Sequence, residues 1–277
     1  MPELPEVESL RRLLTDSACG RTIVAARISE PRLRRRVAQE LVDAIVGKTI
    51  HRIRRRAKYL LIDLSGNLTL LVHLGMSGSL THRGEDFRDD EFDPVHDHLR
   101  FALDDGTALV YNDPRRFGLM KLVACGELEQ TQELAGLGPE PLGEGFDAEY
   151  IFKRTRGRKA AIKNLLMDQR IVAGIGNIYA CEILFAAGVR PGRAGARITR
   201  AEAQRIAAFT KSILASAIGS GGTTFRSYRD SRGQPGRFVT SLQVYGRGGE
   251  PCLRCGTSIK LRVLGQRSSF YCPACQR

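Results

Sequence analysis

The sequence predicts an α+β protein in which a β-sandwich with one flanking helix is followed by a helical region and a C-terminal β-hairpin. Three observations support this fold class. Apolar residues recur with the period of strands in the first half of the 277 residues, helical periodicity replaces it after a segment rich in glycine and proline, and two Cys-x2-Cys pairs lie near the end of the chain. A hydrophobic fraction of 42% is enough to form cores in about two domains.

The first half is predicted to contain the flanking helix and the sandwich. Pro5 suits the first turn of a helix over residues 5–19, and Gly20 can terminate it. Strand-like runs follow at residues 23–28, 50–64, 68–74, 99–103, 107–111 and 119–123. Because the connections between most of these runs are short, we expect antiparallel pairing.

The second half is predicted to be mainly helical. Its candidate helices cover residues 148–155, 158–167, 177–187 and 199–218. A glycine-rich loop from Gly219 to Gly236 precedes the cysteine-bearing module. We therefore expect a domain over 1–135, a linker over 136–146, a second domain with this loop over 147–240, and a terminal module over 241–277.

The charge of the chain predicts an anionic partner. Forty-three Lys and Arg residues against thirty Asp and Glu residues give a net charge of +13. Nucleic acid is favoured over an anionic membrane surface or a purely solubilising charge. The start of the chain has neither a basic nor an apolar leader segment, and no apolar run approaches the length of a membrane span. Seven cysteines, three of them isolated at Cys19, Cys125 and Cys181, favour a reducing, cytoplasmic environment.

Four cysteines near the C-terminus predict one structural zinc ion. Two Cys-x2-Cys pairs separated by sixteen residues match a tetrahedral site made by two knuckles: Cys252, Cys255, Cys272 and Cys275. All four positions of the ion are filled by protein, so the zinc is expected to be structural. The intervening residues read as two strands joined by Gly265-Gln266-Arg267, which would hold Arg267 rigid against a phosphate.

Two basic runs and one glycine-rich turn are candidates for contacts with nucleic acid. Residues 52, 54, 56 and 58 would share one face of a strand, and the run from Lys153 to Lys163, which includes Arg158, contains no acidic residue. The turn Gly174-Ile175-Gly176-Asn177 lacks the strand and the third glycine of a dinucleotide fingerprint, but its amides could hold a DNA phosphate. A solvated face and a tight interhelical turn are the alternatives.

The chain start supplies a candidate nucleophile. Removal of Met1 would leave the secondary amine of Pro2, and an α-amino group with a pKa near 8 is partly neutral at pH 7. A neutral amine can form a Schiff base with a sugar carbon, and Glu3 or Glu6 could exchange protons with the substrate. The alternative is that Pro2 merely begins a helix cap. No Ser-His-Asp set is evident. His96-Asp97-His98 resembles a metal-binding pair, but the loop before it, from Glu85 to Asp97, is interpreted as solvated. His73 could contact a phosphate or lie in the core.

Together these motifs resemble the formamidopyrimidine-DNA glycosylase family over nearly the whole chain. The matching segments are Pro2-Glu3-Leu4-Pro5-Glu6-Val7-Glu8, Lys58-Tyr59-Leu60, His73-Leu74-Gly75-Met76-Ser77-Gly78, Asp113-Pro114-Arg115-Arg116-Phe117-Gly118, Gly174-Ile175-Gly176-Asn177-Ile178-Tyr179 and the zinc module. The resemblance implies a β-sandwich, a helix-two-turn-helix domain and a β-hairpin zinc finger. It also implies a monomeric enzyme, associated with the nucleoid through DNA, that removes 8-oxoguanine and formamidopyrimidines from damaged double-stranded DNA and cleaves the abasic site.

The resemblance also assigns roles to residues. Pro2 would be the nucleophile and Glu3 the proton donor, with Lys58 and Arg267 completing the catalytic set and Glu6 giving proton transfer or structural support. The residues expected to contact DNA are His73, Met76, Arg115, Arg116, Phe117, Arg158, Asn177 and Arg226. Met76, Arg115 and Phe117 would fill the space left by the everted nucleotide.

Two other functions stay open at this point. An endonuclease VIII-like enzyme for oxidised pyrimidines usually has glycine where Leu4 stands, so Leu4 favours the purine branch. A DNA-binding paralogue without catalysis would keep the zinc hairpin but lose the amine, and the presence of Pro2, Glu3 and Lys58 argues against it.

Overall fold

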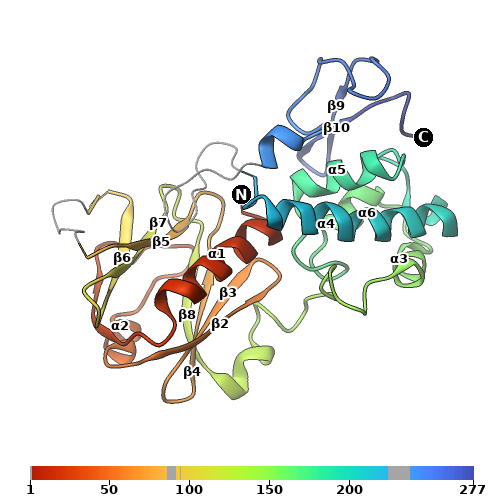
Figure 1. Ribbon diagram of the computed structural model, residues 1–277. Helices are drawn as coiled ribbons and strands as arrows, with labels where there is room; N and C mark the ends of the chain where they lie inside the picture. Colours follow the sequence, from red (N-terminus) through yellow and green to blue (C-terminus); the bar gives the residue numbers. More distant parts are fainter. Residues whose placement is uncertain (1, 86–91, 94, 224–237) are drawn as a thin grey trace. The chain divides into compact units, whose positions relative to one another are not determined.

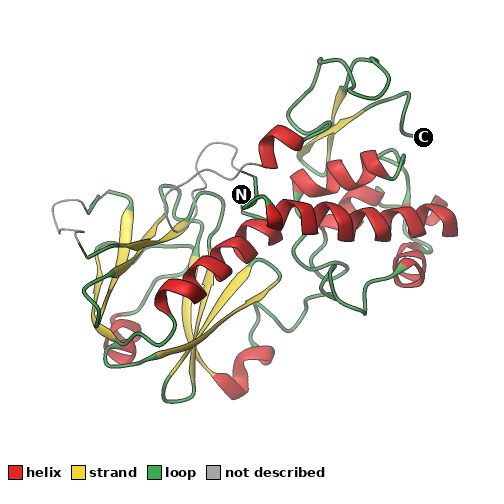
Figure 2. Cartoon of the chain, viewed as in Figure 1, coloured by secondary structure: helices red, strands yellow, loops and turns green. Residues whose placement is uncertain are grey.

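The structure is a computed structural model that describes residues 2–85, 92–93, 95–223 and 238–277. The chain divides into two compact units (Figures 1 and 2). The first unit comprises Met1–Ala135 and Ile218–Val239. The second comprises Gly136–Ala217 and Thr240–Arg277.

The first unit contains two antiparallel four-stranded sheets, which confirms the predicted β-sandwich. One sheet has the order β2-β3-β4-β8, with strands Ile50–Arg56, Tyr59–Leu64, Leu68–His73 and Leu119–Ala124. The other has the order β1-β6-β7-β5, with strands Ile23–Ile28, Asp97–Leu103, Ala108–Asn112 and Ser79–Arg83. β4 therefore ends at His73 beside the start of β8, since His73 pairs with Leu119.

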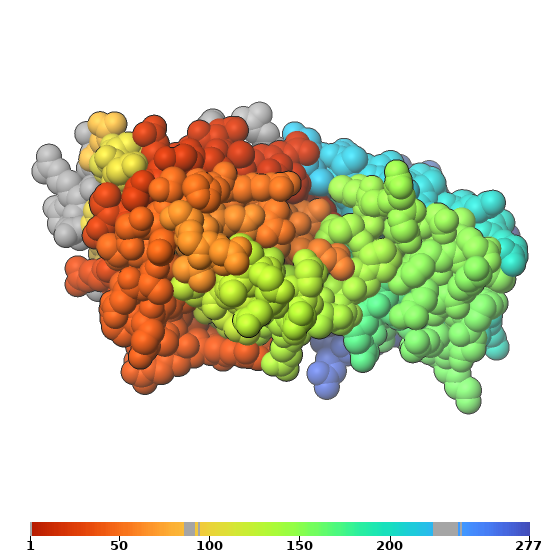
Figure 3. Space-filling view, turned by 90° about the horizontal axis from the view of Figure 1, so that it is seen from below, coloured from red at the N-terminus to blue at the C-terminus, as the bar shows by residue number. Residues whose placement is uncertain are grey.

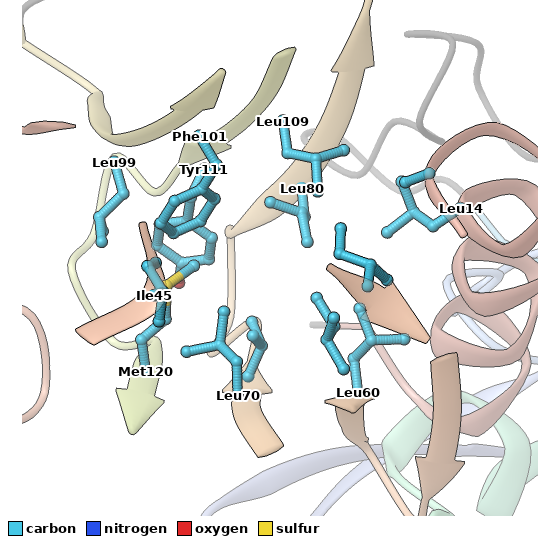
Figure 4. Close-up of a cluster of buried hydrophobic side chains, with 14 of the residues drawn as sticks. Leu14, Ile45, Leu60, Leu70, Leu80, Leu99, Phe101, Leu109, Tyr111 and Met120 are labelled. Carbon is cyan, nitrogen blue, oxygen red and sulfur yellow. The ribbon is translucent and has the colours of Figure 1, made fainter. Parts of the chain in front are cut away.

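Apolar side chains from both sheets form the core of this unit (Figure 4). Leu60 and Leu70 come from the first sheet, and Phe101 and Tyr111 from the second. All four are at most 1% exposed. Helix α1, Leu4–Ala18, adds Leu14 to the same core and packs mainly on β2. The chain start is thus attached to a rigid layer of the sandwich.

Two shorter helices complete the first unit. Helix α2, Gln39–Ile45, packs on β1, and the 3-10 helix η2, Cys125–Gln130, follows β8 and contacts β4. In Figure 3 the yellow-green atoms of the segment after β8 lie against the orange atoms of the neighbouring strands. Helix α2 and strand β5 were not predicted from the sequence.

The predicted strand over residues 50–64 is wrong, because a turn divides it into β2 and β3. Ala57 has a φ of 53°, which non-glycine residues rarely adopt, so the sequence carries no Gly or Asn signal for this turn. Lys58 lies in the turn and is only 7% exposed. It therefore does not share a strand face with Arg52, Arg54 and Arg56.

The second unit is helical, with the cysteine-bearing hairpin attached. Its elements are α3 Ala148–Thr155, α4 Ile162–Met167, α5 Asn177–Ala186, η3 Gly195–Arg197, α6 Arg200–Gly219, η4 Phe238–Ser241, β9 Lys260–Leu264 and β10 Arg267–Tyr271. The end of α6, from Ile218, and the start of η4, up to Val239, belong to the first unit. Helix α5 is buried on all sides from Ile178 to Phe185, which its mainly apolar sequence explains. The one charged residue in this stretch, Glu182, accepts the main-chain amides of Gln243, Val244 and Tyr245. Over the described residues, no helix combines the length and apolar character that crossing a bilayer requires.

Candidate active site and nucleic-acid interface

Pro2 and Glu3 are buried at the entrance of helix α1. Glu3 occupies the N-cap position and Glu6 the N3 position of a capping box. The Glu6 Oε2 atom accepts the Glu3 main-chain N–H at 2.8 Å, and both glutamates are 1% exposed. Since the bonded amide belongs to the residue after Pro2, this contact fixes the direction in which the chain start leaves the helix.

The same Glu6 carboxylate holds the base of the glycine-rich loop. Its Oε1 atom accepts the Thr223 N–H at 2.7 Å, while the Phe238 N–H donates to the Gly222 carbonyl at 3.0 Å. Gly222 has a φ of +84°, and a Cβ there would lie 2.9 Å from Glu6 Oε1. With each oxygen of Glu6 bonded to a main-chain amide, the geometry favours structural support over proton transfer for this residue.

Lys58 and His73 lie near one another at the ends of adjacent strands. The His73 Nδ1 atom accepts the Gly75 N–H at 3.0 Å, and its ring lies 4.9 Å from that of Tyr59. Burial, followed by the charges of Lys58 and Arg34, lowers the pKa of His73 to about 4. The ring is therefore neutral at pH 7 and carries its proton on Nε2, a donor of the kind that a phosphate accepts.

Arg55 supports the turn that carries Lys58. Its guanidinium donates to the Ala57 carbonyl at 3.1 Å and pairs with Glu8 at 3.2 Å. Arg54 pairs with Asp63 at 2.6 Å. These pairings show that the first basic run is not a free cationic face.

Asp113 joins the two loops that were predicted to form the wedge. It is fully buried, and its Oδ1 atom accepts the Ser77 hydroxyl at 2.7 Å while Oδ2 accepts the Gly118 N–H at 2.8 Å. The Tyr111 hydroxyl also donates to Oδ2, at 3.4 Å, and a Cβ on Gly118 would lie 1.6 Å from this hydroxyl. Burial and the negative charge of Asp113 raise the pKa of Tyr111, which stays a donor.

The side chains presented by these loops surround a cavity of about 250 Å³. Its lining consists of Arg34, His73, Gly75, Met76 and Phe117. Phe117 is 46% exposed despite its size, and the Arg115 guanidinium lies 4.7 Å from the centre of its ring. Arg116 has a φ of 56° and pairs with Glu30 at 3.2 Å. The structure thus brings Met76, Arg115 and Phe117 together on one unit with His73.

In the second unit, two side chains attach strand β10 to the helical part. The Asn177 Nδ2 atom, at the first position of α5, donates to the Ser268 carbonyl at 3.0 Å. The Lys163 Nζ atom donates to the same carbonyl at 2.9 Å and to the Ser269 hydroxyl at 2.6 Å. Lys163 is fully buried, so the prediction that it belongs to a basic surface is wrong.

These bonds position the neighbouring Arg267. The turn of the hairpin is Gly265-Gln266, with positive φ at both residues, and Arg267 is the first residue of β10 rather than part of the turn. A Cβ on Gly265 would lie 2.9 Å from the side chain of Asn164. Arg267 itself is exposed, as a phosphate contact requires.

The four predicted zinc ligands converge. Their Sγ atoms all lie within 4.8 Å of one another. Tetrahedral zinc with Zn–S bonds of about 2.3 Å places sulfur atoms about 3.8 Å apart, so the cluster fits the ion. The Cys275 N–H donates to Cys272 Sγ at 3.4 Å, as expected of a metal knuckle, and Gln276 secures the Cys272 amide at 2.9 Å.

Arg158 is exposed between α3 and α4. Arg226 lies outside the described residues. No specific role was predicted for Arg34, Ser77 or Asp113, and Lys163 was predicted to belong to a basic surface. Arg34 belongs to the basic run of residues 32–36, which was overlooked, whereas only the fold reveals that Lys163 is buried.

Comparisons with known proteins agree with this arrangement. Family models match the formamidopyrimidine-DNA glycosylase N-terminal domain at residues 1–120, its H2TH domain at 137–229, and the zinc finger found in FPG and IleRS at 249–277. Formamidopyrimidine-DNA glycosylase of Thioalkalivibrio sulfidiphilus is 48% identical over 279 residues, covering 100% of both chains.

Two solved structures are similar throughout. MutM (FPG) protein from Thermus thermophilus has a TM-score of 0.87 at 38% identity, covering 99% of this chain and 98% of that one. A variant of the Lactococcus lactis FPG, bound to DNA containing Fapy-dG, has a TM-score of 0.91 at 33% identity and covers 100% of both chains.

The β-sandwich, the H2TH helices and the four-cysteine hairpin, in this order, define a DNA-repair glycosylase with a zinc finger. The chain belongs to the formamidopyrimidine-DNA glycosylase family. It is accordingly a bifunctional glycosylase and AP lyase that binds damaged DNA and acts on oxidised purines.

Proposed function

We propose that Pro2 is the nucleophile of both reactions. Its neutral amine attacks C1′ of the damaged nucleotide, the N-glycosidic bond breaks, and the base leaves with a proton. Glu3 protonates the sugar ring oxygen as the ring opens, which leaves an iminium ion between C1′ and the Pro2 nitrogen. Successive β- and δ-elimination then expel the 3′ and 5′ phosphates. The observation that carries this proposal is the burial of Pro2 and Glu3 at a chain start fixed by Glu6.

The phosphate contacts are divided between the two units. Lys58 and the Nε2–H of His73 would hold phosphate groups from the first unit. Asn177 and Arg267 would do so from the second, because both are positioned by the Ser268 segment. Arg158 and Arg226 are proposed to add contacts with the DNA backbone.

The wedge would replace the everted nucleotide. Flipping a base costs a few kcal/mol of stacking and pairing, which inserted side chains offset. Met76 and the exposed Phe117 supply apolar surface, and Arg115, stacked on Phe117, would face the orphan cytosine. Arg116 would contact DNA beside them while paired with Glu30.

The remaining features follow from this activity. The zinc ion would be held by Cys252, Cys255, Cys272 and Cys275, where it supplies rigidity to the hairpin and takes no part in the chemistry. We propose that the enzyme acts as a monomer on chromosomal DNA in the cytoplasm. We also propose the division into segments 1–135, 136–146, 147–240 and 241–277, in which the nucleophile and the wedge both belong to the first segment.

Borohydride trapping on a duplex with 8-oxoguanine opposite cytosine tests the nucleophile. We expect a covalent adduct that peptide mass mapping places on the amino-terminal proline. The variant Pro2→Gly should give much less adduct, whereas Pro5→Ala, another buried proline at the start of α1, should trap normally. An adduct on an internal lysine such as Lys58 would contradict the proposal. A parallel duplex carrying an oxidised pyrimidine measures the preference for purines.

A further inference from the structure

The second unit contains an arginine-lined pocket that the reaction described above does not use. It has a volume of about 370 Å³, and its walls come from the segment after α5, the hairpin and the last residue of the chain. Its lining consists of Arg190, Pro191, Gly192, Arg193, Arg197, Arg262, Tyr271 and Arg277. We refer to these eight residues as the arginine pocket. Its volume lies in the range of small-molecule sites.

Most of the positive charge in the arginine pocket is not neutralised. Arg193 pairs with Glu202 at 2.7 Å, and Arg190 donates to the neutral carbonyls of Pro273 and Gln276. Within the described part of the chain, the guanidinium groups of Arg197, Arg262 and Arg277 have no hydrogen-bond or ion-pair partner. Guanidinium groups that converge without a counter-charge repel one another, so an anion would be favoured there.

The shape of the pocket is set by rigid neighbours. Arg262 and Tyr271 lie on the same face of the hairpin, since Arg262 pairs with Ser269, two residues from Tyr271. The Arg190 N–H donates to the Arg277 main-chain oxygen at 2.9 Å, which joins the segment after α5 to the last residue. Gly192 lies beside Arg262, since a Cβ there would be 3.6 Å from the Arg262 guanidinium.

We propose that the arginine pocket binds a terminal phosphate group. A phosphate monoester carries up to two negative charges and three acceptor oxygens, which match several forked guanidinium donors better than the single charge of a DNA phosphodiester does. The ring of Tyr271 offers a surface for an attached base. Two sources share this chemistry: a free 5′-nucleotide and the phosphorylated end of a DNA strand.

Calorimetric titration of the full-length protein distinguishes these sources. The probes are inorganic phosphate, 5′-AMP, adenosine, and a short undamaged duplex with either a 5′-phosphate or a 5′-hydroxyl. We expect 5′-AMP to bind and adenosine not to bind if the nucleotide is the ligand. A tighter complex with the phosphorylated duplex than with its hydroxyl counterpart identifies the DNA end. Binding of inorganic phosphate supports the site in either case.

Two pairs of variants test whether the pocket is responsible. Arg197→Gln combined with Arg262→Gln should weaken binding at least about tenfold, since each change removes a charge-assisted contact. Arg200→Gln combined with Lys211→Gln removes the same charge from helix α6 and should leave binding within about twofold. Gly192→Glu should place a carboxylate beside Arg262 and compete with the anion, whereas Gly192→Gln should compete much less. The proposal is overturned if no phosphate-bearing probe binds or if both double variants lose binding equally.

Discussion

Replacing Asp113 by asparagine should loosen the wedge without unfolding the sandwich. The carboxylate accepts bonds from Ser77, Gly118 and Tyr111 in a site with no solvent exposure. An asparagine could keep its carbonyl toward Gly118 and turn its NH2 toward the Ser77 Oγ atom, which already accepts the Arg115 N–H at 3.3 Å. At least one charge-assisted bond is lost, so we expect a loss of about 2 kcal/mol in the free energy of unfolding. For a unit of this size that corresponds to about 4–8 °C in Tm.

Differential scanning calorimetry and two activity assays check this expectation. The wedge helps to move a damaged base out of the DNA stack, and it matters less at an abasic site, where no base has to be moved. Asp113→Asn should therefore reduce glycosylase turnover on 8-oxoguanine more than lyase turnover on a preformed abasic site. Asp104→Asn, which makes the same chemical change on an exposed turn, is the matched control. If the two variants melt alike, or if both activities of Asp113→Asn fall equally, the role assigned to Asp113 is wrong.

Three further predictions concern pH, zinc and the buried lysine. The pKa of His73 is about 4 in the folded protein against 6.5 for the free side chain, so the wild type should lose about 3 kcal/mol of its free energy of unfolding as pH falls from 6.5 to 4. In urea titrations, the free energy of unfolding of His73→Gln should depend less on pH. Equal pH dependence in the two proteins would contradict the lowered pKa. Chelating the zinc should abolish duplex binding while the first unit keeps its thermal transition, whereas retained affinity would mean that the hairpin does not hold DNA. Lys163→Met should weaken DNA binding through Arg267, while Lys211→Met should not; equal affinities in a fluorescence anisotropy assay would show that Lys163 positions nothing.

The sequence was most informative where periodicity and spacing carry the structure. The helix at 148–155 was predicted with the bounds that the structure gives, and the cysteine spacing predicted a cluster whose sulfur atoms do converge. Both are local patterns. The turn at Ala57 carries no such pattern, because the Arg55 side chain that donates to the Ala57 carbonyl is itself held by Glu8, 47 positions earlier in the chain.

Burial of charged residues was the main property that the sequence could not reveal. Lys163 belongs to a run of basic residues, yet it bonds to Ser268 and Ser269, about a hundred positions further along the chain. Asp113 was recognised as part of a motif, but its three donors come from two loops and a strand that only the folded sandwich brings together. Long-range pairing of this kind leaves no trace in local composition.

The pairing of basic residues also limits how the net charge of +13 acts on DNA. Glu8 contacts Arg11, Arg12 and Arg55, and Glu30 contacts Arg32 and Arg116. A cation that already has a carboxylate partner releases fewer counterions when it meets a phosphate. The salt dependence of duplex binding should therefore be smaller than the net charge suggests, and it should be set mainly by exposed residues such as Arg158 and Arg267. The arginine pocket differs from these paired residues, because within the described part of the chain only one of its five arginines, Arg193, pairs with a side-chain carboxylate.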